Sequence, residues 1–135
     1  MLCALLLVPC ARAAVRLDAA WVRETAPGQT VGAGYLTIVN LSARPERLLG
    51  AFSPAAEAVQ IHEMSLHDGV MRMRQLEAGI VIPSNSTVKL ETGGTHLMLL
   101  RLKAPLVPGQ SFPITFKFRD SGMVTTSFVV EPIGK

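Results

Sequence analysis

Turn-forming residues recur at intervals of about eight to twelve residues, and this spacing constrains the fold more than any other feature of the chain. Pro27-Gly28, Asp68-Gly69 and Gly93-Gly94 are examples. The short segments between the turns are rich in β-branched and aromatic residues, and several alternate apolar and polar side chains. The segments expected to form strands are 16–23, 34–40, 47–52, 59–64, 70–76, 80–82, 87–91, 96–103, 112–119 and 124–130. No long amphipathic helical pattern is present, so the sequence predicts one domain, an antiparallel β-sandwich or Greek-key barrel.

Residues 1–13 have the pattern of an export signal. An apolar run over residues 2–8 ends at Pro9, and Ala11-Arg12-Ala13 matches an A-x-A cleavage site. The run is too short to span a membrane, and the positively charged start that is usual in signal peptides is missing. We therefore expect a signal peptide over residues 1–13, truncated or wrongly started, and an exported mature domain over residues 14–135.

Both cysteines, Cys3 and Cys10, lie in this leader or at its edge. A lipid anchor on Cys10 is an alternative, although Pro9 directly before it is a poor match to the small residue usual at that position. The mature domain then has no thiol, which excludes a disulfide, a thiolate nucleophile and a thiolate metal ligand. Any metal ion bound by the mature domain must use other donor atoms.

Charge and aromatic content argue against nucleic-acid binding. The net charge is +3 at pH 7, the basic residues are scattered, and the chain has one Trp and one Tyr. A nucleic-acid surface would normally show a clustered basic stripe with stacking aromatic side chains. Ser65, His67 and Asp68 have the side chains of a catalytic triad, but near neighbours in one turn cannot take its spatial order. We expect a globular protein that is not an enzyme.

Histidine and methionine are concentrated in residues 61–74, which read IHEMSLHDGVMRMR. Residues two apart on a strand share a face, so His62 lies beside Met64, and Met71 lies beside Met73. The Asp-Gly pair between them predicts a tight hairpin. A two-residue turn pairs Met64 with Met73, whereas a longer loop pairs His62 with Met73. Either register puts the four side chains on one face, within reach of one another.

A second His-x-Met pair lies downstream at His96 and Met98, with Leu97 and Leu99 on the opposite face. Imidazoles and thioethers without a thiolate form a soft, neutral ligand set that favours Cu(I), while imidazole alone also accepts zinc or Cu(II). A single methionine on a strand is more often core filler, and a single histidine is more often on the surface. The repeated pattern is what favours a soft-metal site. Of the other such residues, His67 fits a solvated turn residue and Met123 fits packing.

These residues resemble the periplasmic CuA-assembly copper chaperones, the PCuAC family. The family motif is a histidine, then a methionine, then a closing His-x-Met pair. The matching residues here are His62, Met73, His96 and Met98, with ten residues between the first two and twenty-two between Met73 and His96. The resemblance covers nearly the whole mature chain and includes the strand predicted at 34–40.

The resemblance implies a cupredoxin-like β-sandwich that binds one Cu(I) ion near its surface, with Met64 and Met71 beside the site rather than in it. It also implies a periplasmic metallochaperone that passes copper to the CuA centre of cytochrome c oxidase, in concert with a thioredoxin-like Sco assembly factor. Some members have a His/Met-rich C-terminal tail with a Cu(II) site; residues 131–135 show no such pattern, so one site is expected. The rival hypotheses are a periplasmic copper-resistance or storage protein and a metal-free β-sandwich adaptor.

Overall fold

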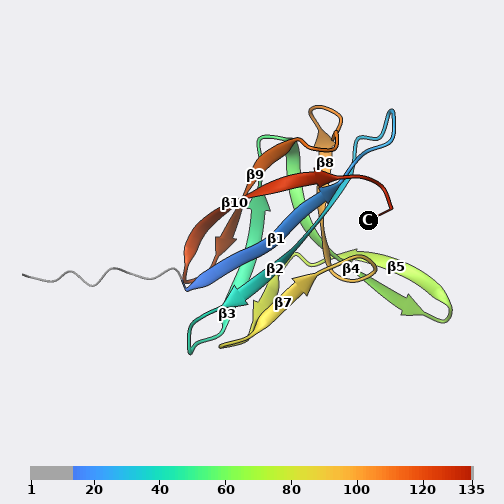
Figure 1. The fold of residues 1–135 in the computed structure, drawn as a ribbon. Coiled ribbons are helices and arrows are strands. Elements are labelled where there is room, and N and C mark those ends of the chain that lie inside the picture. Colours follow the sequence, from blue (N-terminus) through green and yellow to red (C-terminus); the bar gives the residue numbers. More distant parts are fainter. Residues whose placement is uncertain (1–13, 135) are drawn as a thin grey trace, which may run out of the picture.

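The structure, a computed structural model, describes residues 14–134, which form only β-strands, turns and irregular segments (Figure 1). The strands are Val15–Arg23 (β1), Gly32–Asn40 (β2), Glu46–Phe52 (β3), Ala56–His67 (β4), Val70–Gln75 (β5), Ile80–Ile82 (β6), Thr87–Leu90 (β7), His96–Leu102 (β8), Ser111–Phe118 (β9) and Gly122–Glu131 (β10). Each segment expected from the sequence overlaps one of these strands, so the all-β prediction is confirmed. No helix in the described part of the chain is long and apolar enough to cross a membrane. The predicted signal peptide lies outside the described residues.

Seven strands close into a barrel in the order β4-β8-β2-β1-β10-β9-β3. The ring closes where β3 returns to β4, with Ala51 opposite Val59. Strand β6 pairs with β3, β7 pairs with β2, and β5 extends the sheet from the free edge of β4. Within residues 14–134 the strand pairs are antiparallel except for β1 with β10. That parallel pair is the one departure from the predicted antiparallel architecture.

The barrel interior holds the hydrophobic core. Phe116 and Phe128 stack with 5.9 Å between their ring centroids, and Ile61, Leu97 and Leu99 are buried. Because successive side chains on a strand point to opposite faces, the residues between these on β4 and β8 point away from the core. A one-residue slip would turn the buried leucines of β8 toward solvent, so burial of the core face fixes the register of the outer face as well.

A buried carboxylate ties β3 to the β9–β10 turn at one end of the barrel. Glu46 accepts hydrogen bonds from the backbone N–H groups of Arg47, Asp120 and Ser121, at 2.8, 3.1 and 2.9 Å, and from the Ser121 hydroxyl at 2.9 Å. Burial raises the pKa of Glu46, but these hydrogen bonds outweigh it and hold the pKa below its ordinary value. The carboxylate therefore stabilises the fold in its charged form.

Candidate metal centre

The β4–β5 hairpin has a two-residue turn. Asp68 and Gly69 have φ values of 48° and 76°, as a type I′ turn requires. Met64 lies directly opposite Met73. The shorter of the two predicted registers is therefore correct, and the alternative with a longer loop is wrong. Figure 1 shows the hairpin extending away from the barrel.

Strand β8 lies on the other side of β4 and brings the second His-x-Met pair beside the first. His62 is directly opposite His96, and Gln60 is opposite Met98. On β5, His62 pairs directly with Gln75, so Met73, two residues before Gln75, is its diagonal neighbour. The four predicted ligands thus share one face of three neighbouring strands, and that face is turned away from the core.

His96 is held in one tautomer by the turn that precedes it. Its side chain is buried, and Nδ1 lies 2.9 Å from the carbonyl oxygen of Gly94. A carbonyl only accepts hydrogen bonds, so Nδ1–H donates and Nε2 keeps an unprotonated lone pair. Histidines that bind metal ions usually have their second nitrogen fixed in this way. His96 is therefore oriented as a metal ligand would be.

His62 is held by the side chain two residues earlier. Its Nε2 lies 2.9 Å from Oε1 of Gln60, while Nδ1 is buried without a hydrogen-bond partner among residues 14–134. With the amide oxygen accepting, Nε2 carries the proton and Nδ1 keeps a lone pair. Burial lowers the pKa of His62, and His96, whose ring centroid is 6.3 Å away, lowers it further. The neutral form, which binds metal ions, is thereby favoured near neutral pH.

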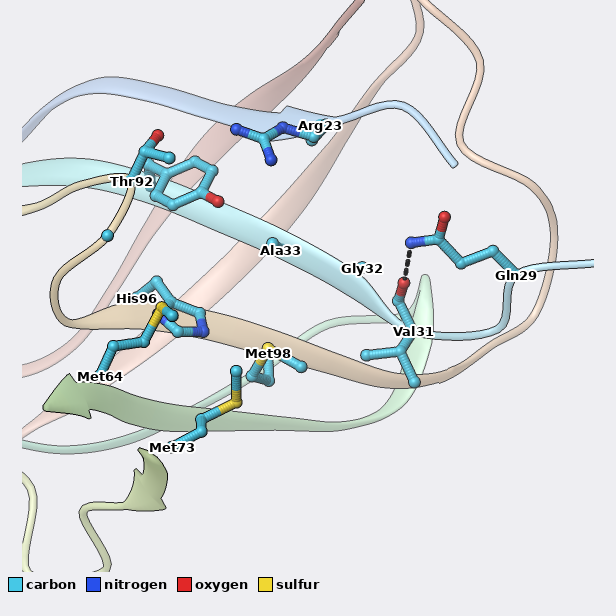
Figure 2. Close-up of a pocket in the computed structure, with 12 residues that line it drawn as sticks. Arg23, Gln29, Val31, Gly32, Ala33, Met64, Met73, Thr92, His96 and Met98 are labelled. Atoms are coloured by element: carbon cyan, nitrogen blue, oxygen red, sulfur yellow. Dashed lines mark hydrogen bonds between the residues drawn. The ribbon is translucent and has the colours of Figure 1, made fainter. Parts of the chain in front are cut away.

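A hollow of about 500 Å³ opens beside these residues. Met64, Met73 and Met98 line it together with His96, and Figure 2 shows these side chains converging from β4, β5 and β8. His62 is not among the lining residues. The structure therefore brings three of the four predicted ligands into one hollow and places the fourth beside it. Met64, predicted as a neighbour of the site, lies within the hollow.

The remaining candidate residues lie elsewhere. Met71 is exposed near the end of the hairpin, opposite Leu66, and does not line the hollow. His67 is exposed at the end of β4, as predicted for a solvated residue at the turn. Met123 is 64% exposed on β10, so the prediction that it is a packing residue is wrong. Its position after the β9–β10 turn carries it to the surface.

The donor set around the hollow is soft. The lining contains no acidic residue, and residues 14–134 contain no group of three or more His, Cys, Asp or Glu side chains suited to a metal ion. Calcium and magnesium need several oxygen donors, whereas imidazole and thioether suit Cu(I). The arrangement is therefore fitted to a soft monovalent ion.

Four contributors to the site were missed from the sequence. Gln60 and Gly94 orient the two imidazoles, and Arg23 and Tyr35 line the hollow from β1 and β2. Gln60 precedes His62 by two residues on the same strand, so same-face spacing could have indicated it, whereas Gly94 lies in the turn before β8 and acts through its backbone carbonyl, which this spacing does not indicate. Arg23 and Tyr35 carry no local signal, because only the order of strands in the barrel brings them to the site.

The fold is similar to solved PCuAC domains. The copper-bound PCuAC domain from PmoF2 matches with a TM-score of 0.72 and 27% identity, covering 88% of this chain and 93% of that one. The solution structure of CuI-DR1885 from Deinococcus radiodurans matches with a TM-score of 0.67 and 29% identity, covering 88% of this chain and 78% of that one. The resemblance to the PCuAC family inferred from the sequence is confirmed.

Sequence relatives identify the family. "Putative lipoprotein Lxx21020" of Leifsonia xyli subsp. xyli is 36% identical over 119 residues, which cover 88% of this chain and 69% of the relative. "Uncharacterized protein RP573" of Rickettsia prowazekii is 31% identical over 82% of this chain and 63% of its own length. Residues 15–130 match the family described as "Putative lipoprotein LpqE-like". The chain therefore belongs to the LpqE-like family, and its fold is that of the PCuAC domains.

Proposed function

We propose that this protein binds one Cu(I) ion through His62, Met73, His96 and Met98, with Met64 beside them. One observation carries the proposal: each imidazole has one nitrogen fixed by a nearby oxygen and keeps a lone pair on the other nitrogen, and His96 lines the hollow with three thioethers while His62 pairs with it on the neighbouring strand. The buried Nδ1 of His62 has no partner among the described residues, which costs free energy that a bound ion would offset. The copper-bound structures of PmoF2 and DR1885 support the same cargo.

We further propose that the protein is an exported metallochaperone rather than an enzyme, with residues 14–135 as the mature domain. The signal-peptide pattern of residues 1–13 and the lipoprotein name of its relative support export, and the PCuAC resemblance supports a periplasmic location. Delivery to the CuA centre of cytochrome c oxidase, with a Sco-type assembly factor, follows from the same resemblance. Met73 is 50% exposed, so an acceptor could reach this ligand, as copper transfer requires.

A competitive titration tests the copper site. The chain without its leader is titrated with Cu(I) against a chromogenic Cu(I) chelator. The wild type should bind one equivalent, and the Met73→Leu and His96→Leu variants should lose most of the affinity. Met123→Leu is the matched control, because it removes a thioether that is exposed on β10 and does not line the hollow. If the wild type does not compete with the chelator for Cu(I), the proposal is wrong, and the rival hypothesis of a metal-free β-sandwich adaptor is favoured.

A transfer assay separates the chaperone from a storage protein. The Cu(I)-loaded protein is mixed, without oxygen, with an apo CuA domain, with an apo Sco-type protein or with both, and the copper content of the separated proteins is followed. We expect copper to move to the CuA domain or to a Sco-type protein. Retention of copper in the presence of both acceptors would favour resistance or storage instead.

A further inference from the structure

The hollow beside the candidate copper site is larger than a metal ion requires. Its volume of about 500 Å³ falls within the range of small-molecule pockets. The thioethers form one side, and Figure 2 shows Arg23, Gln29 and Val31 around the rest of the rim. Gln29 already donates its amide N–H to the Val31 carbonyl at 2.6 Å. Arg23 is the only Lys, Arg, Asp or Glu among the described residues that line the hollow.

Aromatic rings hold the guanidinium of Arg23, which has no anionic partner among residues 14–134. Its Cζ lies 6.0 Å from the ring centroid of Trp21 and 5.8 Å from that of Tyr35, which are cation–π contacts. Nε is buried without a hydrogen-bond partner among residues 14–134, and Arg23 forms no ion pair within that part of the chain. Glu131, its neighbour in the register of β1 with β10, does not line the hollow.

Such an arginine matches one class of ligand. A guanidinium presents a planar fork of donors, and its two terminal nitrogens fit a carboxylate in a two-point contact. Arg23 is the one Lys or Arg among the described residues of the lining, so it matches the single charge of a carboxylate better than the two charges of a phosphate monoester. The rest of the lining, including Val31, Ala33 and the thioether of Met98, suits an apolar body. The charge and the lining together specify an anion with an apolar portion.

We propose that this hollow binds a small monocarboxylate with an apolar body, with Arg23 as the residue that pairs with the carboxylate. The limited volume favours a small molecule over an extended acidic segment of a protein. The net charge of +3 helps to attract an anion. The ligand would share the hollow with the thioethers, but its anchoring residue is not a proposed copper ligand, so the site does not depend on copper binding.

The single tryptophan of the chain reports on this site, because Trp21 lies against the Arg23 guanidinium. The copper-free protein is titrated at constant ionic strength with cyclohexanecarboxylate and with the uncharged match cyclohexanecarboxamide, and Trp21 fluorescence is followed. We expect saturable binding of the carboxylate and a much weaker response to the amide. Arg23→Gln should weaken carboxylate binding by about tenfold or more. Arg16→Gln, on the same strand but ion-paired with Asp18 outside the hollow, should bind like the wild type.

Calorimetry provides a second measurement, because Arg23→Gln also changes the surroundings of the fluorophore. Arg23→Lys keeps the charge but loses the fork and should bind with intermediate affinity. Equal binding of the carboxylate and the amide, no saturable binding of the carboxylate, or unchanged affinity in a folded Arg23→Gln variant would overturn the proposal. Since no copper is present in these titrations, their outcome is separate from that of the copper titration.

Discussion

Replacement of Gln60 by leucine tests how the candidate copper site is oriented. The Gln60 amide oxygen lies 2.9 Å from Nε2 of His62, on a half-buried side chain. Leucine has a similar size but offers no acceptor. The neutral imidazole of His62 is then free to carry its proton on Nδ1, the nitrogen whose lone pair is proposed to bind copper. Before Cu(I) can bind at Nδ1, the proton must move from Nδ1 back to Nε2.

The expected loss of Cu(I) affinity is about tenfold, or about 1.4 kcal/mol. This is the lower end of the range for residues that orient metal ligands, because the acceptor is a neutral amide whose hydrogen bond contributes only about 1 kcal/mol net. Gln60→Glu should have the opposite effect. A carboxylate strengthens the hydrogen bond to Nε2–H and makes the ring a better donor, so Cu(I) affinity near neutral pH should rise.

The competitive chelator titration measures these affinities, and Gln75→Leu is the matched control. Gln75 lies opposite His62 on β5, but its side chain makes no hydrogen bond to the imidazole in the described structure. Gln75→Leu should therefore leave the affinity close to that of the wild type. Equal losses in the two leucine variants, or no loss in either, would refute the argument that Gln60 sets the tautomer of His62.

Three further predictions concern the fold and its charges. NMR titration of the copper-free protein should give His62 a pKa below the ordinary histidine value. Because the pKa is lower in the folded state than in the unfolded state, His62 stabilises the fold at pH values above the ordinary histidine pKa, and this contribution is lost as the pH falls from there through the folded-state pKa. The free energy of unfolding should therefore fall over that pH range, and it should fall less in His62→Gln. Glu46→Gln should lower the free energy of unfolding in urea by about 2–3 kcal/mol, and the wild type should lose this contribution as the pH falls below the ordinary glutamate pKa. In thermal melts Gly79→Ala should be far more destabilising than Gly28→Ala. Both glycines have a positive φ, which costs alanine about 1–2 kcal/mol. Only at Gly79 would the new Cβ also clash, because it would lie 1.8 Å from the Leu48 carbonyl oxygen.

The strands were predictable because apolar alternation is a local signal. Leu97 and Leu99 were expected on the core face of their strand, and both are fully buried. The start of β4 was placed at Val59, whereas the strand begins at Ala56, because the alanines of this segment give little contrast between core and solvent positions. The parallel pairing of β1 with β10 has no local signal, since Trp21 meets Val129 only after the barrel has closed. Spacing along the chain predicts strands, not their order around a barrel.

The sequence was enough to predict that the residues of the candidate site share one face of the sheet, but not which of them line the hollow. Two-residue periodicity and one tight turn suffice to bring His62, Met64 and Met73 together, and the structure has both the predicted strand pairing and the two-residue turn. Their division into ligands and neighbours came from the family pattern, and in the structure Met64 lines the hollow while His62 lies beside it. Strands twist and hairpins coil strongly, so depth around a concave surface cannot be read from the register of a flat sheet.

The two halves of the site differ in how firmly they are held. His96 lies on β8, which has β4 and β2 as hydrogen-bonded neighbours on its two sides. Met73 lies on β5, an edge strand whose six residues are all exposed, so little buried apolar surface stabilises it. Local opening costs least where apolar burial is smallest. In a Cu(I) site built on these residues, Met73 is therefore the ligand most easily released, while the buried imidazole of His96 retains the ion as an acceptor approaches the hairpin.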